Sequence, residues 1–290
     1  MSIQVMTDSV ASLPANLARE NNIKIVPAAH IYYDNHEYID GITLSASQAY
    51  EMIEKDPDRF VTSAIKPAYL IEQYSEISKD VKNILFITLS SALSASNKTA
   101  QLAAESFMEN SPQTTIKVFD SMTVSGAEGL IVLAAAQAAK TIKSIDSLIT
   151  YTEYVRQQTK GVMMLDTLRY VYRTGRMSKL GSRIASMFNI KPINIVNAEG
   201  KIEMIDRTRN SDDGLELLVN YIKKHTGTKS LKFIVSHANS YVMANKLSNI
   251  LKEQFDCLAT YISDYSPVMG YGAGPGAIFV GFQPELNLPK

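Results

Sequence analysis

"NILFITLS", residues 83 to 90, is the most informative short run of this 290-residue chain. It is almost continuously apolar and ends in serines, as the next residue is Ser91. Strands of parallel sheets are covered on both faces and read as unbroken apolar runs, whereas strands with one wet face alternate. The segment "SNKTAQLAAESFMEN" (96–110) follows with a helical pattern. The run therefore predicts a buried parallel strand followed by a helix.

Similar strands and helices lie on both sides of this unit. Further strands are predicted in "IQVMTDS" (3–9), "IKIVPAAHIYY" (23–33) and "TIKVFDS" (115–121). A helix follows the capping-box pair Ser45 and Gln48, Pro67 opens another at a position where proline is tolerated, and a third covers 126–142. Alternating strands and helices predict an α/β domain with a parallel sheet and right-handed crossovers, which we assign to residues 1–160.

The remaining residues, 161–290, read differently. Two strand-like runs flank "NAEGK" (197–201), which predicts a β-hairpin. Other strands are expected in 161–167, 230–238, 257–264 and 277–282, and helices in 168–176, 178–188, 211–226 and 239–255. Hairpins combined with helices predict an α+β domain with a mixed or antiparallel sheet. A ligand would then lie between the two domains.

Composition excludes several classes of protein. Lysine plus arginine and aspartate plus glutamate each number 29, so the chain lacks the basic excess of a nucleic-acid-binding protein. The one cysteine, Cys257, excludes an internal disulfide and a cysteine-rich zinc site. No secretion signal opens the chain, and the longest apolar run, "LIVLAAAQAA" (130–139), is too short for a transmembrane segment. We therefore expect a soluble, cytoplasmic protein.

Motifs for nucleotides, metals and catalytic nucleophiles are weak or missing. Gly272, Gly274 and Ala277 match a dinucleotide-binding spacing, but a β-branched run follows where a helix should begin. "HEYID" (36–40) starts like a zinc-binding helix but ends in Asp40 instead of histidine. The sequence contains no phosphate-binding Walker loop and no G-x-S-x-G nucleophile turn. We expect no cofactor and no metal.

Hydroxyl-bearing segments follow several of the apolar runs. They are "TDS" (7–9), "VTSA" (61–64), "SSALSASN" (90–97) and "DSMTVS" (120–125). Segments after the strands of an open α/β sheet line one crevice, where ligands bind, and hydroxyls there could hold an anion. Helix capping is the better explanation of any single segment, but four such segments with no catalytic base nearby in the sequence favour a binding crevice. Asp8 is either a ligand contact or a turn former, and His237 either packs or caps a helix or belongs to a site.

At these segments the chain resembles the DegV family of bacterial fatty-acid-binding proteins. The similarity extends over essentially the whole chain, and the order of the motifs carries it. The matching segments are "TDSVASLP" (7–14), "YIDGITLS" (38–45), "TSAIKP" (62–67), "SSALSASNKTA" (90–100), "DSMTVSGAEG" (120–129), "YVYRTGRMS" (170–178), "KPI" (191–193) and "PVMGYGAGPG" (267–276).

The resemblance implies a long-chain fatty acid held between two domains, by a protein that is not itself catalytic. The carboxylate would meet Thr62 and Ser94, beside Ser63 and Ala95, and the tail would enter an apolar tunnel. Some family members present the acyl carboxylate to a separate ATP-binding fatty acid kinase subunit, which makes an acyl-phosphate for phospholipid synthesis. We add candidates for three roles: Met187, Phe188 and Ile190 line the tail; Gly270, Tyr271 and Gly272 close the pocket; and Arg173, Arg176, Arg207 and Arg209 dock the partner.

The chain departs from the family pattern at several site positions. Ala64, Ala95, Ser96, Asn97 and Thr174 replace the usual residues, and Gly272 stands where the family often has a histidine donor. Neighbouring Tyr271 is a possible substitute donor. Two alternatives remain open. The chain could be a hydrolase or transferase acting on a small anionic or acyl substrate, with Ser94 or Asp8 in the chemistry, or its arginines could serve docking alone.

Overall fold

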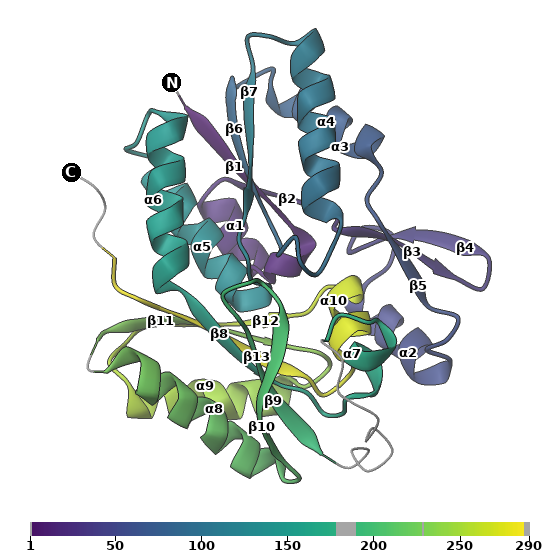
Figure 1. The fold of residues 1–290 in the computed structure, drawn as a ribbon, viewed down its shortest axis with the longest axis vertical. Helices are drawn as coiled ribbons and strands as arrows, with labels where there is room; N and C mark the ends of the chain where they lie inside the picture. The colour runs from purple at the N-terminus through teal and green to yellow at the C-terminus, as the bar shows by residue number, and fades with distance from the viewer. Residues whose placement is uncertain (1, 178–189, 228, 287–290) are drawn as a thin grey trace.

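The structure is a computed structural model that describes residues 2–177, 190–227 and 229–286. Its strands form three sheets with the orders β2-β1-β6-β7, β10-β9-β8-β13-β11-β12 and β4-β3-β5. The first sheet is parallel and the second is mixed (Figure 1). This arrangement confirms the predicted fold class. No helix in these three ranges is long and apolar enough to cross a membrane.

The parallel sheet contains the run from which the prediction started. Its strands are β1 (Ile3–Asp8), β2 (Ile23–Val26), β6 (Asn83–Thr88) and β7 (Thr115–Asp120). Helices α3 (Pro67–Ile77) and α4 (Ser96–Asn110) cover one face; α1 (Ala15–Glu20), α5 (Ser125–Ala138) and α6 (Ile145–Gln158) cover the other. In β6, Ile84 and Phe86 pack in the α3–α4 cluster, while Leu85 and Ile87 pack in the α5 cluster. The strand is buried on both faces, as its sequence predicts.

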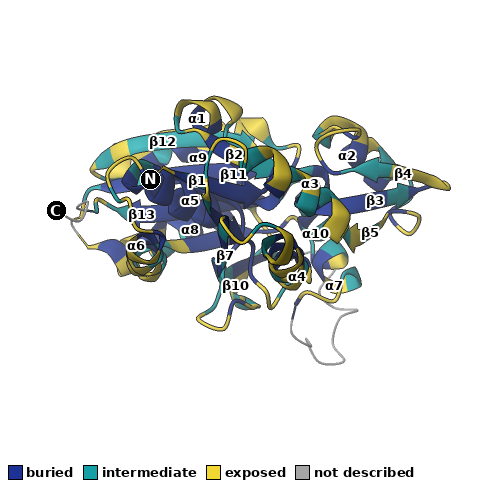
Figure 2. Cartoon of the chain, turned by 90° about the horizontal axis from the view of Figure 1, so that it is seen from above, coloured by how far each residue is buried: buried dark blue, intermediate teal, exposed yellow. Residues whose placement is uncertain are grey.

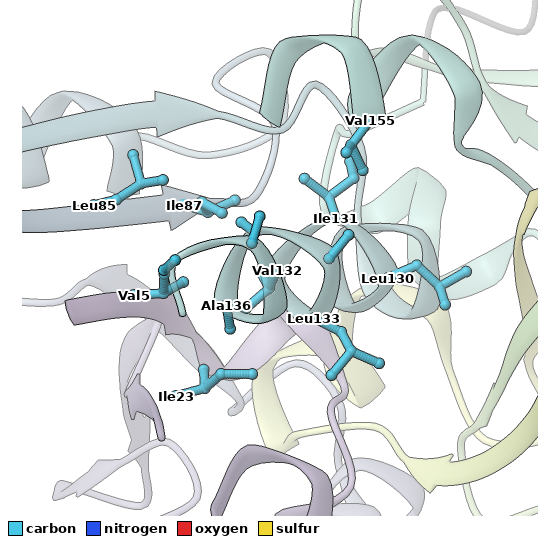
Figure 3. Close-up of a cluster of buried hydrophobic side chains, with 14 of the residues drawn as sticks. Val5, Ile23, Leu85, Ile87, Leu130, Ile131, Val132, Leu133, Ala136 and Val155 are labelled. Carbon is cyan, nitrogen blue, oxygen red and sulfur yellow. The ribbon is translucent and has the colours of Figure 1, made fainter. Parts of the chain in front are cut away.

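Helix α5 lies between the parallel sheet and the mixed sheet. Every residue from Ser125 to Ala138 except Gln137 is buried, and Figure 3 shows its side chains among those of β1, β2, β6 and α6. On its other side the backbone of α5 lies directly against the backbone of strand β13 (Ile278–Pro284) of the mixed sheet. A Cβ added to Gly281 would come within 2.2 Å of the Gly126 carbonyl carbon. The two halves of the chain therefore share one continuous core around α5, dark blue in Figure 2.

The mixed sheet supplies most of the second half of the chain. Its strands are β8 (Lys160–Met164), β9 (Lys191–Val196), β10 (Ile202–Thr208), β11 (Leu231–His237), β12 (Cys257–Asp264) and β13 (Ile278–Pro284). Helices α8 (Ser211–Thr226) and α9 (Tyr241–Gln254) cover its outer face. The β9–β10 hairpin closes where predicted, because Asn197 donates its amide to the Lys201 carbonyl at 2.9 Å. The sheet begins at Lys160, while the domain boundary near this residue stays a prediction.

The third sheet corrects the sequence analysis. The run 23–33 is not one stretch of strand: it breaks at Pro27 and Ala28 into β2 and β3 (Ala29–Tyr33), which belong to different sheets. Proline lacks an amide donor, so a strand is readily interrupted there. β3 pairs with β4 (His36–Ile39) and with β5 (Val61–Ala64), so "VTSA" is itself a strand. Helices α2 (Ala46–Lys55), α7 (Arg169–Arg173) and α10 (Pro267–Ala273) lie beside this sheet (Figure 1).

Candidate ligand cavity

A cavity of about 190 Å³ lies where the third sheet meets the mixed sheet and the loop after β6. Much of its lining is apolar, and comes from separate parts of the chain. These residues include Val10, Leu89, Leu93, Val124, Met163, Leu165, Val171, Ile202, Val268 and Met269. Several of them fall in the family segments quoted above, but apart from Ala95, Tyr271 and the neighbouring Ile190 the sequence analysis assigned none of the apolar surroundings to a ligand. The residues meet because the ends of β1, β6 and β8 lie close to α7 and α10.

The predicted hydroxyl residues do line this cavity. Thr62 and Ser63 come from β5, and Ser94 and Ala95 come from the loop between β6 and α4. Thr62 is opposite Ile31 in the β3–β5 ladder, and within the described ranges its hydroxyl has no hydrogen-bond partner. Its neighbour Ser63 is more exposed. The structure thus brings the two hydroxyl segments to one cavity and leaves the Thr62 hydroxyl available.

The Ser94 hydroxyl is held by its own loop. The hydroxyl oxygens of Ser94 and Ser96 lie 2.8 Å apart, and Ser96 Oγ also donates to the Ala28 carbonyl at 3.3 Å. Asn97 Nδ2 donates to Thr88 Oγ1 at 2.9 Å. Ser96 and Asn97, two of the departures from the family pattern, are therefore buried groups that fix the loop. They connect it to β6 and to the residue before β3.

The glycine-rich segment contains a helix, not only the turn that the sequence suggested. Helix α10 begins with Pro267, since a proline is tolerated in a first helical turn, and ends at Ala273, where Gly274 follows with a φ of +85°. Gly270 must be glycine, because an added Cβ would come within 2.4 Å of Tyr50 Cε1. Gly272 lines the cavity, and an added Cβ there would meet no atom within 4 Å.

Tyr271 lines the cavity from the same helix and is held on two sides. Its ring stacks on Phe60 at 5.0 Å between centroids, and the Arg173 guanidinium lies 5.0 Å from the ring centroid. Arg173 also pairs with Asp58 at 2.8 Å. Arg173 is therefore mostly withdrawn from solvent, with only 22% of its side chain exposed. The three other predicted docking arginines, Arg176, Arg207 and Arg209, are exposed, and Arg176 lines the cavity.

Of the predicted tail-lining residues, Met187 and Phe188 lie outside the described residues. Ile190 is buried, with 8% of its surface exposed, in the cluster that contains Met163, Leu165 and Val171 of the cavity wall. It borders the apolar part of the cavity without lining it.

Two buried carboxyl groups, those of Asp8 and Glu128, lie near the cavity without lining it. Asp8 accepts hydrogen bonds from the backbone amides of Val10 and Leu89, both at 2.9 Å, so it is a turn former. Burial raises the pKa of its carboxyl to about 7. Glu128 of α5 accepts from Thr7 Oγ1 at 3.2 Å, and burial raises its pKa well above the usual value. Neither residue lines the cavity, and the described residues contain no group of three metal-ligating side chains.

His237 is also a packing residue. It is 3% exposed at the end of β11, its Nδ1 accepts from the Ser240 amide at 3.4 Å, and Asp264 lies 3.3 Å away. Burial lowers the pKa of its imidazole, although Asp264 opposes this shift.

These features define an α/β protein with a largely apolar cavity whose polar part consists mainly of hydroxyl groups. A model of the DegV family matches residues 2–285, and the chain belongs to this family. A DegV domain-containing protein of Caldanaerobacter subterraneus is 26% identical, over 97% of this chain and 98% of its own.

Two solved structures show the same fold. DegV, a fatty acid binding protein from Bacillus subtilis, has a TM-score of 0.87 at 24% identity and covers 98% of this chain and 100% of its own. The fatty acid kinase (Fak) B3 protein of Streptococcus pneumoniae, loaded with linoleic acid, has a TM-score of 0.86 at 20% identity and the same coverage.

Proposed function

We propose that this protein binds a long-chain fatty acid in the cavity and presents it to a separate kinase subunit. The observation that carries the proposal is the composition of the cavity wall. The Thr62 and Ser94 hydroxyls reach a space otherwise bounded largely by aliphatic and methionine side chains. Each methylene of a tail buried there contributes about 0.8 kcal/mol. The Thr62 hydroxyl donates a charge-assisted hydrogen bond to the carboxylate, and Ser94 donates a second one once its hydroxyl turns away from Ser96 Oγ.

The composition of the cavity also favours presentation over catalysis. Among the described residues that line it there is no histidine, carboxylate, lysine or cysteine. A hydrolase or transferase needs a general base within hydrogen-bond reach of its nucleophile. Ser94 instead shares its hydrogen bond with Ser96 at 2.8 Å. The cationic group of the lining is Arg176, whose Nε donates to the Leu93 carbonyl at 3.3 Å.

Extraction of the purified protein under denaturing conditions tests the ligand. Mass spectrometry should find a long-chain fatty acid in the extract at near-stoichiometric amount. The double variant Thr62→Val with Ser94→Ala should bind added oleate at least about tenfold more weakly, as expected for lost hydrogen bonds to a charged group. Ser91→Ala, an exposed serine of the same loop outside the cavity lining, is the matched control. An empty extract from a protein that also fails to bind added oleate would reject the proposal.

The kinase partner needs its own experiment. Arg176, which lines the cavity, and Arg207 on β10 are exposed cations that a partner can reach. The double variant Arg176→Glu with Arg207→Glu should no longer copurify with an ATP-binding fatty acid kinase subunit. The single variant Arg207→Glu should bind oleate as the native protein does. Copurification that survives both reversals would remove these arginines from the docking surface.

A further inference from the structure

A second cavity, of about 420 Å³, lies on the other side of the β9–β10 hairpin. The loop 121–123 after β7, the end of α6, the start of β8 and the hairpin residues 195–198 line it. It opens where two paired strands separate. β8 starts at Lys160 and β9 continues to Val196, yet their ladder joins only residues 162–164 to 193–195. The start of β8, before Val162, and the end of β9, after Ile195, are therefore not paired with each other and form the two sides of a fork.

The lining of this second cavity is more polar than that of the first and carries positive charge. Arg156 and Lys160 contribute two cations, Thr123 contributes a hydroxyl and Gln157 an amide, and no aspartate or glutamate is among the lining residues. The chain as a whole has no net charge, so the excess of positive charge is specific to this cavity. The exposed side chain of Lys160 has no ion pair or hydrogen bond within the described parts of the chain.

Arg156 is fixed before any ligand arrives. Its guanidinium lies 5.1 Å from the Phe119 ring centroid, and its Nη1 donates to the Asp120 carbonyl at 3.1 Å. Its Nη2 pairs with Glu153 at 2.7 Å, which offsets part of its charge. The side chain keeps 24% of its surface exposed. A guanidinium held in this way loses little conformational freedom when it binds an anion.

We propose that this fork is a second ligand site, which binds a small molecule carrying a phosphate group. Two cations with hydroxyl and amide donors fit a phosphate, which has three strong acceptor oxygens and up to two negative charges, better than a neutral molecule. The cavity exceeds the size of one phosphate ion, so the phosphate is part of a small organic molecule.

A short chain of hydrogen bonds joins this fork to the first cavity. The Thr123 carbonyl accepts from the Ser90 amide at 2.8 Å, and the Ser90 carbonyl accepts from the Ser94 amide at 3.2 Å. Ser90 Oγ donates to the Gly200 carbonyl at the tip of the hairpin, also at 2.8 Å. The hairpin lines both cavities, since Ile202 belongs to the first. A ligand that orders Thr123 and the hairpin therefore orders the Ser94 loop, and should slow fatty acid release.

Calorimetric titration of the full chain with ribose 5-phosphate, and with ribose as the uncharged match, tests the site. Only the phosphate ester should bind with a saturable heat, at millimolar concentration or below. Lys160→Gln and Thr123→Val should each weaken it, the first by about tenfold for one lost charge-assisted contact. Lys117→Gln, an exposed lysine on β7 outside the fork, should not. Absence of saturable binding, or equal binding to Lys160→Gln and the native chain, overturns the site.

The coupling rests on the proposed function and is measured separately. Saturating ribose 5-phosphate should slow oleate release several-fold, and Ser90→Ala, which removes the bond to the Gly200 carbonyl but keeps both backbone bonds, should reduce this change. An unchanged release rate overturns the coupling. A chain that binds ribose 5-phosphate but no oleate contradicts the proposed function and leaves the second site standing. In that case the amide resonance of Ser94 should still shift on addition of ribose 5-phosphate, and a resonance that stays in place overturns the coupling.

Discussion

The carboxylate of Asp40 accepts a hydrogen bond of 3.0 Å from the backbone amide of Val268, 228 positions further along the chain. Asp40 is almost completely buried and also accepts a hydrogen bond from Ser9 Oγ, which in turn accepts from the Ala28 amide at 3.0 Å. One side chain thus anchors the start of α10 to the loop after β1 and, through it, to the residue before β3. Because α10 lines the first cavity, this carboxylate helps to hold the cavity wall in place.

Replacing Asp40 by alanine should loosen that wall. The variant leaves the half-buried Ser9 and Val268 donors unpaired, so the free energy of unfolding should fall by about 1–3 kcal/mol and oleate release should accelerate. Urea denaturation and stopped-flow release measure the two effects. Glu76→Ala removes an exposed ion pair with Lys79 and should cost less than about 1 kcal/mol. Equal losses in the two variants would contradict the anchoring role.

Glu128→Gln should make the protein more stable at high pH. The native fold holds this carboxyl protonated well above its usual pKa of 4.5 because the group is buried. As pH rises above 4.5, Glu128 ionises in the unfolded chain but stays protonated in the fold. The unfolded state is thereby stabilised, and the free energy of unfolding of the native protein falls. Glutamine keeps the Thr7 contact at Oε1 and carries no titrating proton. Its advantage should therefore grow with pH.

The measurement is urea denaturation of both proteins at pH 5 and pH 8. The difference in unfolding free energy should increase by at least about 1.4 kcal/mol, the equivalent of one pKa unit. Glu105→Gln on the exposed side of α4 should show no such increase. A difference that stays constant between the two pH values would mean that Glu128 is ionised in the fold.

Two glycines of α10 should respond in opposite directions to alanine. Gly272→Ala meets open space and restricts the unfolded chain, so it should raise the free energy of unfolding by about 0.5–1 kcal/mol. Gly270→Ala would press against the Tyr50 ring and should lower it by about 1–3 kcal/mol. Thermal unfolding compares them directly. If the positions proved equally tolerant, the packing of α10 on Tyr50 would be wrong.

The space at Gly272 also admits a larger donor. Gly272→His restores the residue that resemblance to the family suggests at this position, and a protonated imidazole there should bind the carboxylate. Oleate affinity should rise several-fold at pH 6 and less at pH 8, where the imidazole is neutral. Gly272→Phe is the matched control because it fills similar space without a donor. Equal affinity in the histidine and phenylalanine variants would argue against a carboxylate beside α10.

Two variants of Tyr271 distinguish the packing of its ring from hydrogen bonding by its hydroxyl. Tyr271→Phe retains the stack on Phe60 and the Arg173 contact, so stability should stay within about 0.5 kcal/mol of the native value. Tyr271→Leu removes both ring interactions and should cost about 1–2 kcal/mol more. If oleate affinity falls in Tyr271→Phe while stability does not, the hydroxyl contacts the ligand. Unchanged affinity would leave this residue a structural role only.

The buried strand β6 could be predicted from sequence because its four consecutive apolar residues report burial on both faces. The Ser45–Gln48 capping box and the proline that opens α3 were equally local signals, and both are present. Thr62 and Ser94 match family segments and line one cavity, while their contact with a ligand stays a prediction. Such predictions succeed where the determining interactions lie within a few residues of one another.

The rest depends on contacts between distant segments. Nothing local to Arg173 indicates that Tyr271 and Asp58 will cover it, so it read as a surface cation. The third sheet was missed because its strands are short and Pro27 sits inside what looked like one run. Asp8 and Asp40 appear equivalent in sequence, yet one forms a turn while the other anchors α10.

The direct backbone contact between Gly126 of α5 and Gly281 of β13 has a consequence for how a lipid could enter. With no side chain between them, the helix and the strand cannot slide or part without losing contact along their whole length. The two sheets then behave as one rigid unit, and the chain should unfold in a single cooperative transition. Entry of an acyl chain is left to the small elements around the rim, α7, α10 and the hairpin, so exchange should be fast relative to unfolding.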